Sequence, residues 1–320
     1  MADVLIYGAG AIGSFVGYLL SELGTSPVEN VALLGRKGHI QRIREAGLKI
    51  NIPGKQITLP FRYCFSSLDE LDESNFRPDL VIICVKTYSL SGVRDEILRS
   101  GALVKSLKNA RFCLLMNGMG NKEKFDPSSE DVYEGITSIG AKFFEDGQIE
   151  LKGWGKTIFE SRIPQQIQVF LRARFEEKGL EIEFSPDFKG QQWNKLFINA
   201  ANNPITALTR MKNEVVISER LKKTVEEVIE ECVSVAEKEG YPADKESVLK
   251  LVRSIVSINS ENISSMLQDV LKGKRTEIDS INGYVVNMAK KHGLHVPVNE
   301  ALYALVKSME IEKQPNETCS

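Results

Sequence analysis

Six residues near the start of the chain constrain its fold more than any other segment. They read Gly8-Ala9-Gly10-Ala11-Ile12-Gly13, follow the β-rich run Val4–Tyr7 directly, and open a stretch with helical character. Gly8 suits a tight turn, Gly10 lets backbone approach a pyrophosphate, and Gly13 lets the helix lie close to the strand. The pattern predicts a dinucleotide at the helix N-terminus, where free N–H groups and a partial positive charge favour phosphates. The alternative is a turn of the same shape that binds no ligand.

This glycine turn also explains an uncharged run that otherwise suggests a signal peptide or a membrane span. The run extends from Val4 to Ser21, follows Asp3 with no Lys or Arg before it, and is interrupted by glycines. We interpret it as a buried strand, a turn and a helix. We therefore expect a cytoplasmic protein with no membrane partner.

Strand and helix patterns divide the chain into two regions. In the first, continuous apolar runs alternate with helical stretches, which is typical of a parallel sheet covered on both faces. The expected strands are Val4–Tyr7, Val31–Leu34, Leu80–Val85 and Arg111–Met116. The expected later helices are Gly190–Asn203, Arg220–Gly240, one or two within Lys245–Leu271, Glu277–His292 and Asn299–Glu312. We predict an α/β protein: an N-terminal Rossmann-type dinucleotide-binding domain (residues 1–185) followed by an all-helical C-terminal domain (residues 186–320).

The end of the second expected strand indicates which dinucleotide binds. NAD sites usually place Asp or Glu there, about 20 residues beyond the glycine turn, to bind the ribose hydroxyls. Here the strand ends Leu34-Gly35-Arg36-Lys37, with no carboxylate. A 2′-phosphate would fit beside Gly35 and pair with the planar guanidinium of Arg36. The sequence therefore predicts NADP(H), although a solvated basic loop is the alternative.

Two more polar residues follow strands of the same sheet. Lys86 comes after the third expected strand, and Asn117 follows the fourth in Asn117-Gly118-Met119-Gly120. Ligands of open α/β sheets lie outside the carboxyl ends of the strands, so both residues are expected to face the cofactor. Lys86 could equally be a surface lysine, and Asn117-Gly118 could be ordinary turn chemistry.

The helix expected at 190–203 carries a line of polar groups on a mostly apolar background. Lys195, Asn199 and Asn203 are spaced four residues apart, which places them on one helix face. Pro204 follows and predicts that the helix ends there. Buried polar groups need partners, so these residues either contact a ligand or bond across a domain interface.

A second polar cluster lies nearer the C-terminus. It contains Asn262-Ile263-Ser264-Ser265-Met266 and then Thr276-Glu277-Ile278-Asp279. Thr276 is expected to cap a helix whose first turn contains Glu277. An acid in that position is ordinary helix chemistry, so Glu277 alone does not predict catalysis.

Taken in order along the chain, these motifs resemble the ketopantoate reductase (2-dehydropantoate 2-reductase) family. The resemblance implies NADPH-dependent reduction of 2-dehydropantoate to (R)-pantoate, a step toward pantothenate and coenzyme A, in a cleft between a Rossmann domain and a helical domain. It assigns Lys195 as general acid and Glu277 as the active-site carboxylate. The implied substrate contacts are Asn117, Asn199, Asn203 and Ser265. The implied cofactor contacts are Gly8, Ala9, Gly10, Ala11, Ile12, Gly13, Arg36, Lys86, Asn117 and Glu277.

The implied chemistry makes a demand on Lys195. Hydride addition builds negative charge on the carbonyl oxygen, which an ammonium group can stabilise and protonate. Burial would lower the pKa of this lysine, whereas Glu277 nearby would raise it. The sequence leaves open which effect is larger.

Charge and cysteine content limit the other partners. Lys and Arg number 41 against 43 Asp and Glu, so a broad nucleic-acid surface is not expected. The five scattered cysteines and three histidines predict no metal site. Cys84 is interpreted as an inert buried thiol. Alternatively, Cys84 forms a mixed disulfide with a thiol ligand, such as coenzyme A, that occupies the cofactor site.

Two other functions remain open. The chain could reduce a different 2-keto acid, or it could be a redox sensor that binds NADP without catalysis. A sensor needs no proton donor, so the Lys195–Glu277 pair favours an enzyme. The sequence also leaves open whether the C-terminal helices form a homodimer face or bury one another.

Overall fold

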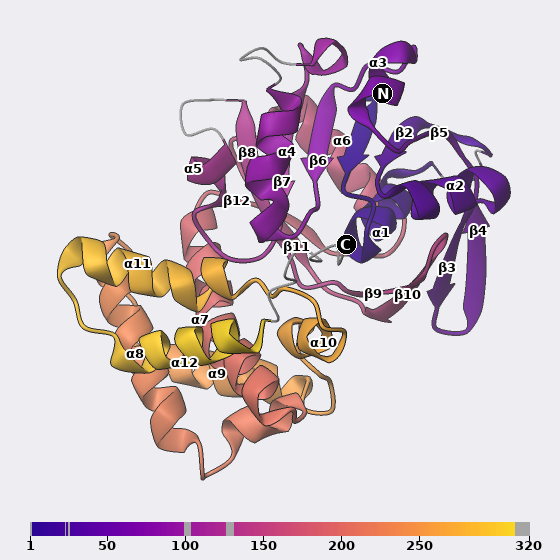
Figure 1. Ribbon diagram of the computed structural model, residues 1–320. Coiled ribbons are helices and arrows are strands. Elements are labelled where there is room, and N and C mark those ends of the chain that lie inside the picture. The colour runs from indigo at the N-terminus through magenta and orange to yellow at the C-terminus, as the bar shows by residue number, and fades with distance from the viewer. Residues whose placement is uncertain (1, 23, 25, 99–103, 126–130, 311–320) are drawn as a thin grey trace, which may run out of the picture. The chain divides into compact units, whose positions relative to one another are not determined.

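An eight-stranded sheet organises the N-terminal half of the computed structural model, which describes residues 2–22, 24, 26–98, 104–125 and 131–310 (Figure 1). Its strand order is β12-β11-β8-β7-β6-β1-β2-β5. The strands are β1 Val4–Tyr7, β2 Val28–Leu34, β5 Phe61–Phe65, β6 Leu80–Ile83, β7 Arg111–Leu115, β8 Val132–Thr137, β11 Thr157–Glu160 and β12 Ile182–Ser185. From β5 to β8 the neighbouring strands are parallel, and β11 is antiparallel to β8. The parallel α/β prediction is therefore confirmed.

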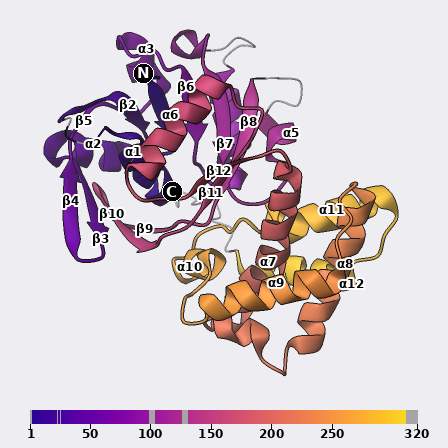
Figure 2. The ribbon, with the colours of Figure 1, turned by 180° about the vertical axis from the view of Figure 1, so that it is seen from behind.

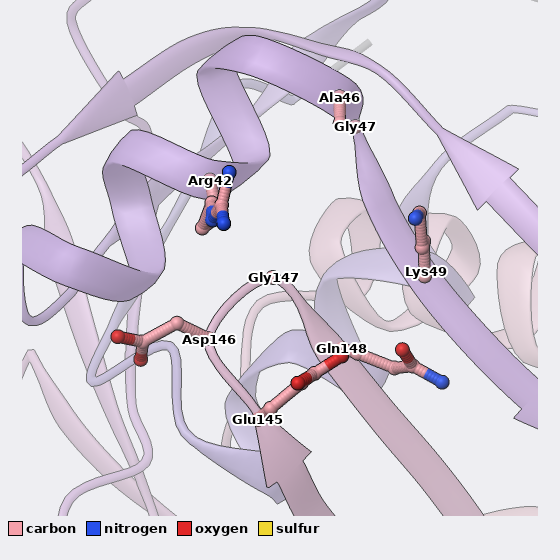
Figure 3. A pocket seen from close by; sticks show the side chains of 8 residues that line it. All are labelled: Arg42, Ala46, Gly47, Lys49, Glu145, Asp146, Gly147 and Gln148. Atoms are coloured by element: carbon pink, nitrogen blue, oxygen red, sulfur yellow. The ribbon is translucent and has the colours of Figure 1, made fainter.

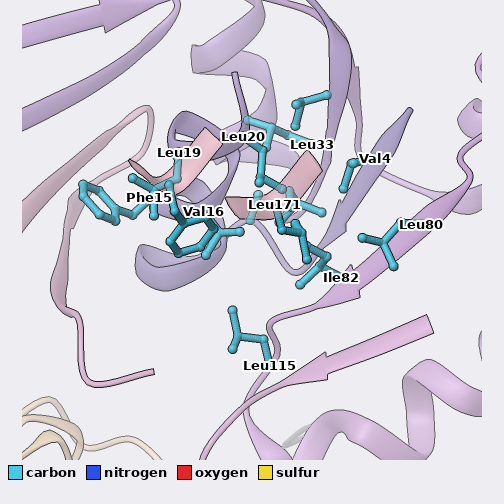
Figure 4. Close-up of a cluster of buried hydrophobic side chains, with 14 of the residues drawn as sticks. Val4, Phe15, Val16, Leu19, Leu20, Leu33, Leu80, Ile82, Leu115 and Leu171 are labelled. Atoms are coloured by element: carbon cyan, nitrogen blue, oxygen red, sulfur yellow. The ribbon is translucent and has the colours of Figure 1, made fainter. Parts of the chain in front are cut away.

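Helices cover both faces of this sheet because alternate residues of its strands are apolar on both sides. Val4 and Ile6 of β1 pack with Phe15 in a cluster on the side of α1 and α6 (Figure 4), whereas Leu5 and Tyr7 pack with the cluster on the side of α3, α4 and α5. These helices are α1 Ala11–Leu20, α2 Lys37–Ala46, α3 Leu68–Glu73, α4 Leu90–Ile97, α5 Asn121–Phe125 and α6 Gln165–Glu176, with short 3₁₀ turns η1 Thr87–Ser89 and η3 Lys105–Leu107.

A second, four-stranded sheet lies in the same half of the chain. Its order is β4-β3-β10-β9, and it joins two segments that are far apart in the sequence. The strands are β3 Leu48–Ile52, β4 Lys55–Leu59, β9 Gly140–Glu145 and β10 Gln148–Gly153. Its inner residues, among them Ile50 and Ile149, join the same apolar cluster as β1 and α1. This sheet was not among the predicted elements.

The chain divides into two units after Phe188, with residues 118–120 packing in the second unit. The second unit contains helices and no strand among its described residues. They are α7 Phe188–Thr209, η4 Asn213–Ile217, α8 Lys222–Lys238, α9 Lys245–Ile258, α10 Ser265–Leu271, η5 Ile278–Ser280, α11 Asn282–His292 and α12 Pro297–Met309 (Figure 2). Trp193 and Phe197 of α7 are fully buried in its core. No helix in the described ranges is both long enough and apolar enough to cross a membrane.

The prediction that α7 ends at Pro204 is wrong, because the helix continues through the proline to Thr209. Proline lacks an N–H and leaves the carbonyl four residues earlier without its helical partner. Here the side chain of Asn282 donates to that carbonyl of Ala200 at 3.0 Å. A partner from another helix therefore replaces the missing bond.

The prediction of one helix over Glu277–His292 is also wrong at its start. Residues 278–280 form the 3₁₀ turn η5, and α11 begins only at Asn282, because Ile281 has the non-helical angles φ −107° and ψ −97°. Thr276 does not cap α11. Its hydroxyl donates to the carboxylate of Glu310 at 2.8 Å and accepts from the N–H of Ile278 at 3.3 Å. The expected end of the last helix, Glu312, lies outside the described residues.

Candidate functional site

The carboxyl ends of four neighbouring parallel strands bring the first group of predicted site residues to one edge of the large sheet. β1 lies between β2 and β6, and β7 pairs with the far side of β6. The chain leaves β1 toward β2 and later returns to β6 on its other side. Such a reversal of strand order creates the ligand-binding crevice of open α/β sheets. The glycine turn, Arg36, Lys86 and Asn117 all follow strand ends at this edge.

The glycine turn has the geometry that a pyrophosphate site needs. Gly8 has φ +95°, and a Cβ there would lie 2.7 Å from Val85. A Cβ on Gly13 would lie 2.2 Å from the Gly8 carbonyl oxygen, so α1 packs directly on the turn. Gly10 differs, because a Cβ there would meet only one atom, 4.0 Å away. The space beside Gly10 is therefore open to a ligand at the N-terminus of α1.

The end of β2 presents a cation. Gly35 packs tightly on the glycine turn, since a Cβ there would lie 3.1 Å from that of Ala9. Arg36 precedes α2 and is exposed. The Cζ atom of its guanidinium lies 5.1 Å from the ring centre of Phe143, a residue of β9. This cation–π contact leaves the guanidinium edge available to an anion.

Lys86 and Asn117 are both partly buried at the ends of their strands. Lys86 immediately precedes the turn η1. The main-chain carbonyl of Asn117 accepts from the side chain of Asn121 at 3.0 Å. The next residue, Gly118, has φ +75°, and a Cβ there would lie 2.4 Å from the carbonyl oxygen of Ser280. The glycine is thus explained by turn geometry and close packing within the second unit.

The second group of predicted residues lies in the helical unit. Lys195, Asn199 and Asn203 are on α7, as the spacing predicts; the first two are partly buried and Asn203 is 4% exposed. Burial lowers the pKa of the Lys195 amine to about 8, and Glu277 raises it by a smaller amount. Burial therefore has the larger effect, which answers the question that the sequence left open. A lysine with this pKa can donate a proton near neutral pH.

Glu277 is 5% exposed and immediately precedes η5. Because the helix starts later than expected, the carboxylate lies in an irregular segment and is not a first-turn helix residue. Two hydrogen bonds hold the residues on either side of Glu277. Tyr303 of α12 donates to Asp279 at 2.9 Å, and Thr276 donates to Glu310, the residue that follows α12. The structure thus fixes a buried acid where its charge acts on Lys195.

Two adjacent serines at the start of α10 have different environments. Ser264 is buried and caps the helix, accepting from the N–H of Leu267 at 3.0 Å. It also accepts from the hydroxyl of Thr206 at 2.6 Å, which ties α10 to α7. Ser265, the predicted substrate contact, is exposed. Its hydroxyl is therefore accessible to a ligand.

Cys84 is partly exposed and lies under the glycine turn, since the hypothetical Cβ of Gly13 would be 3.1 Å from its Cβ. Burial raises the pKa of this thiol to about 12. Little thiolate is then present at neutral pH, which favours the inert interpretation. Cys319 lies outside the described residues.

Phe143 lies against both Arg36 and His39, and neither Phe143 nor His39 was among the predicted site residues. Their ring centres are 4.9 Å apart, and His39 is 1% exposed. No local signal could identify them, because the contact joins α2 to a hairpin far along the chain.

Comparisons with known proteins cover both units. The family described as "Ketopantoate reductase PanE/ApbA" matches residues 4–162, and its C-terminal counterpart matches residues 187–310. The chain is 35% identical over 312 residues to the 2-dehydropantoate 2-reductase of Pyrococcus horikoshii, covering 96% of this chain and 97% of that protein. It is 31% identical over 312 residues to the enzyme of the same name from Archaeoglobus fulgidus, covering 96% and 97%.

Solved structures agree with these matches. A ketopantoate reductase from Ralstonia eutropha has a TM-score of 0.82 and 28% identity, covering 96% of this chain and 98% of that one. A D-mandelate dehydrogenase, solved with NADH and anilino(oxo)acetate, has a TM-score of 0.84 and 26% identity, covering 96% and 97%.

Proposed function

Because this chain belongs to the ketopantoate reductase family, we propose that it reduces 2-dehydropantoate to (R)-pantoate with NADPH. The observation that carries the proposal is the partly buried Lys195, whose pKa is lowered to about 8 by burial and raised by a smaller amount by the buried Glu277. A reductase of keto acids needs such a proton donor, whereas a protein that only binds the cofactor does not.

We assign cofactor binding to the N-terminal domain, residues 1–185. The open space beside Gly10 fits a pyrophosphate, and the exposed Arg36 on Phe143 fits a 2′-phosphate. Ala9, Ala11 and Ile12 would line the turn, with Lys86 and Asn117 nearby at the same sheet edge. When bound, the cofactor supplies the hydride, and the protein supplies binding, orientation and electrostatics.

We assign proton transfer to the C-terminal domain, residues 186–320. Lys195 stabilises the developing negative charge on the substrate oxygen and donates the proton from Nζ. Glu277 opposes the effect of burial on the lysine, so that enough ammonium remains to act as an acid. Asn199 and Asn203 offer donors and acceptors to hydroxyl, keto and carboxylate groups, and Ser265 donates to the carboxylate. Asn117 would contact both the substrate and the cofactor, and Glu277 would also contact the cofactor.

A second candidate is reduction of another 2-keto acid on the same scaffold. It is favoured by the structural similarity to D-mandelate dehydrogenase. Turnover with 2-dehydropantoate, 2-oxoisovalerate and 2-oxo-2-phenylacetate, followed by the absorbance of NADPH or NADH, separates the candidates. A kcat/KM highest for 2-dehydropantoate supports the first proposal, and a higher value for another acid supports the second. Binding of NADPH without turnover of any of these acids would support the alternative of a redox sensor that does no catalysis.

Coenzyme A at the cofactor site remains a prediction that rests on Cys84. The raised pKa of the thiol opposes rapid disulfide exchange. Incubation with oxidised coenzyme A and intact-mass analysis tests it, with Cys84→Ala as control. An adduct that is absent in the control would support the site, and no adduct would end the idea. The homodimer and the cytoplasmic location also remain predictions.

A further inference from the structure

His39 is a buried histidine with two defined hydrogen bonds that the proposed mechanism does not use. The main-chain N–H of Gly147 donates to its Nδ1 at 2.8 Å, and the hydroxyl of Ser14 lies 3.1 Å from its Nε2. Because a backbone N–H can only donate, Nδ1 carries a lone pair in this arrangement. The neutral ring therefore has its proton on Nε2 and donates to Ser14.

The first of these bonds fixes the tip of the hairpin between β9 and β10. The carbonyl of Gly147 accepts from the N–H of Lys49 at 2.9 Å, so both main-chain groups of this glycine are bonded. Gly147 also packs on α2, since a Cβ there would lie 2.8 Å from the Cβ of Arg42. The carboxylate of Asp146 lies against Gly38, where a Cβ would be 2.4 Å from Oδ2. Figure 3 shows the hairpin tip lying beside α2.

The hairpin carries Phe143, whose ring contacts two side chains of the segment that begins α2. The centre of the His39 ring is 4.9 Å from that of Phe143, and the Cζ atom of Arg36 is 5.1 Å from it. Arg36, Phe143 and His39 thus form a continuous set of contacts. Holding the hairpin tip also holds the aromatic ring on which the guanidinium rests.

We propose that His39 is a positioning residue for the selection of a 2′-phosphorylated cofactor, acting through the hairpin and Phe143 on Arg36. The inference rests on the proposed function, in which Arg36 binds the 2′-phosphate. An exposed arginine side chain loses rotamer freedom when it binds a phosphate. A fixed aromatic ring beneath it reduces that loss, because it already restricts the side chain before the phosphate binds. His39 contacts neither cofactor nor substrate in this role.

Two substitutions separate the two hydrogen bonds of the ring. His39→Asn keeps an acceptor close to the position of Nδ1 and loses the bond to Ser14. His39→Gln keeps a donor close to Nε2 and loses the bond to Gly147. The measurement is the ratio of the dissociation constants of adenosine 5′-monophosphate and adenosine 2′,5′-bisphosphate, determined by calorimetry. The two ligands differ only by the 2′-phosphate, and their binding is measured without any turnover.

We expect the preference for the bisphosphate to fall about 3- to 10-fold in His39→Gln, the range for immobilising one flexible side chain. In His39→Asn it should change by less than about twofold. Phe143→Leu, which keeps apolar packing but removes the ring, should match His39→Gln. An unchanged preference in His39→Gln would overturn the inference. If that variant does not fold, an unchanged preference in Phe143→Leu would overturn it, because Phe143 is the contact through which His39 would act on Arg36.

Arg36→Ala distinguishes this failure from failure of the proposed function. If Arg36→Ala lowers the preference but the other variants do not, only the role of His39 is wrong. If Arg36→Ala also leaves the preference unchanged, the 2′-phosphate contact itself is wrong, and the inference loses its basis.

Discussion

Asn282 donates a hydrogen bond from its side chain to the main-chain carbonyl of Ala200 at 3.0 Å, and this carbonyl is the one that Pro204 deprives of its helical partner. The contact lets α7 continue to Thr209. It also connects α11 to the helix that carries Lys195.

This bond predicts energetic coupling between Asn282 and Pro204. Asn282→Ala should lower the free energy of unfolding by about 1–3 kcal/mol, because the buried carbonyl loses its donor. The loss should be smaller in the Pro204→Ala background, where residue 204 regains an N–H. Urea unfolding of the single and double variants measures the coupling. Asn287→Ala, at an exposed position of the same helix, is the control and should stay within about 0.5 kcal/mol. Equal losses in both backgrounds would contradict the interpretation.

Removing the amine of Lys195 should affect catalysis and leave cofactor binding unchanged. Lys195→Met should lower kcat by about 100-fold or more, since general acid catalysis contributes about 10²–10⁴. The dissociation constant of NADPH, from fluorescence titration, should remain close to that of the parent protein. Lys189→Met, at an exposed position of the same helix, should retain activity. Full activity in Lys195→Met would exclude the lysine as the acid.

The pKa of Lys195 also predicts a pH profile. The ammonium form donates the proton, so kcat/KM should be constant below pH 8 and fall about tenfold per unit above the lysine's pKa of about 8. Glu277 raises this pKa, so Glu277→Gln should move the decline to lower pH. A profile that is flat through pH 9, or a shift to higher pH in Glu277→Gln, would contradict the assignment.

Replacing each of two glycines of the turn with alanine should have different effects on stability and on NADPH binding. A Cβ on Gly13 would lie 2.2 Å from the Gly8 carbonyl oxygen. Gly13→Ala should therefore lower the free energy of unfolding by about 1–3 kcal/mol or more, and with it the melting temperature. A Cβ on Gly10 would meet only one atom, at 4.0 Å, so Gly10→Ala should keep its melting temperature and bind NADPH less tightly. Thermal unfolding and NADPH titration of both variants check the pair. Unchanged NADPH affinity in Gly10→Ala would argue against a pyrophosphate at this turn.

Arg36 should discriminate between the two nicotinamide cofactors. A charge-assisted bond to phosphate contributes about 1.5–3 kcal/mol, so Arg36→Ala should raise KM for NADPH about 10- to 100-fold and change KM for NADH little. Arg42→Ala, at an exposed position of α2, the helix that follows Arg36, serves as the matched control. Equal effects on both cofactors would remove the 2′-phosphate contact.

Local patterns predicted the elements that depend on near neighbours. The apolar runs of β1, β6 and β7 and the turn at Gly8–Gly13 were identified correctly. The small sheet was not identified, because β3 and β10 pair across a long stretch of chain.

Residue spacing predicted that Lys195, Asn199 and Asn203 share one helix, but not where that helix ends. Proline at 204 favours a helix end unless a donor replaces the lost bond, and Asn282 comes from another helix. Thr276, which was expected to cap α11, bonds instead to Glu310, 34 positions away.

The sequence by itself determined a glycine turn between a buried strand and a helix, and a second strand that ends in Gly35-Arg36 without an acid, since both are properties of adjacent residues. Only the tertiary structure decided that burial exceeds the opposing effect of Glu277 on the pKa of Lys195, and that Arg36 rests on Phe143. Both results depend on which distant side chains exclude water from a charge or lie beneath it, and chain folding alone brings those side chains together.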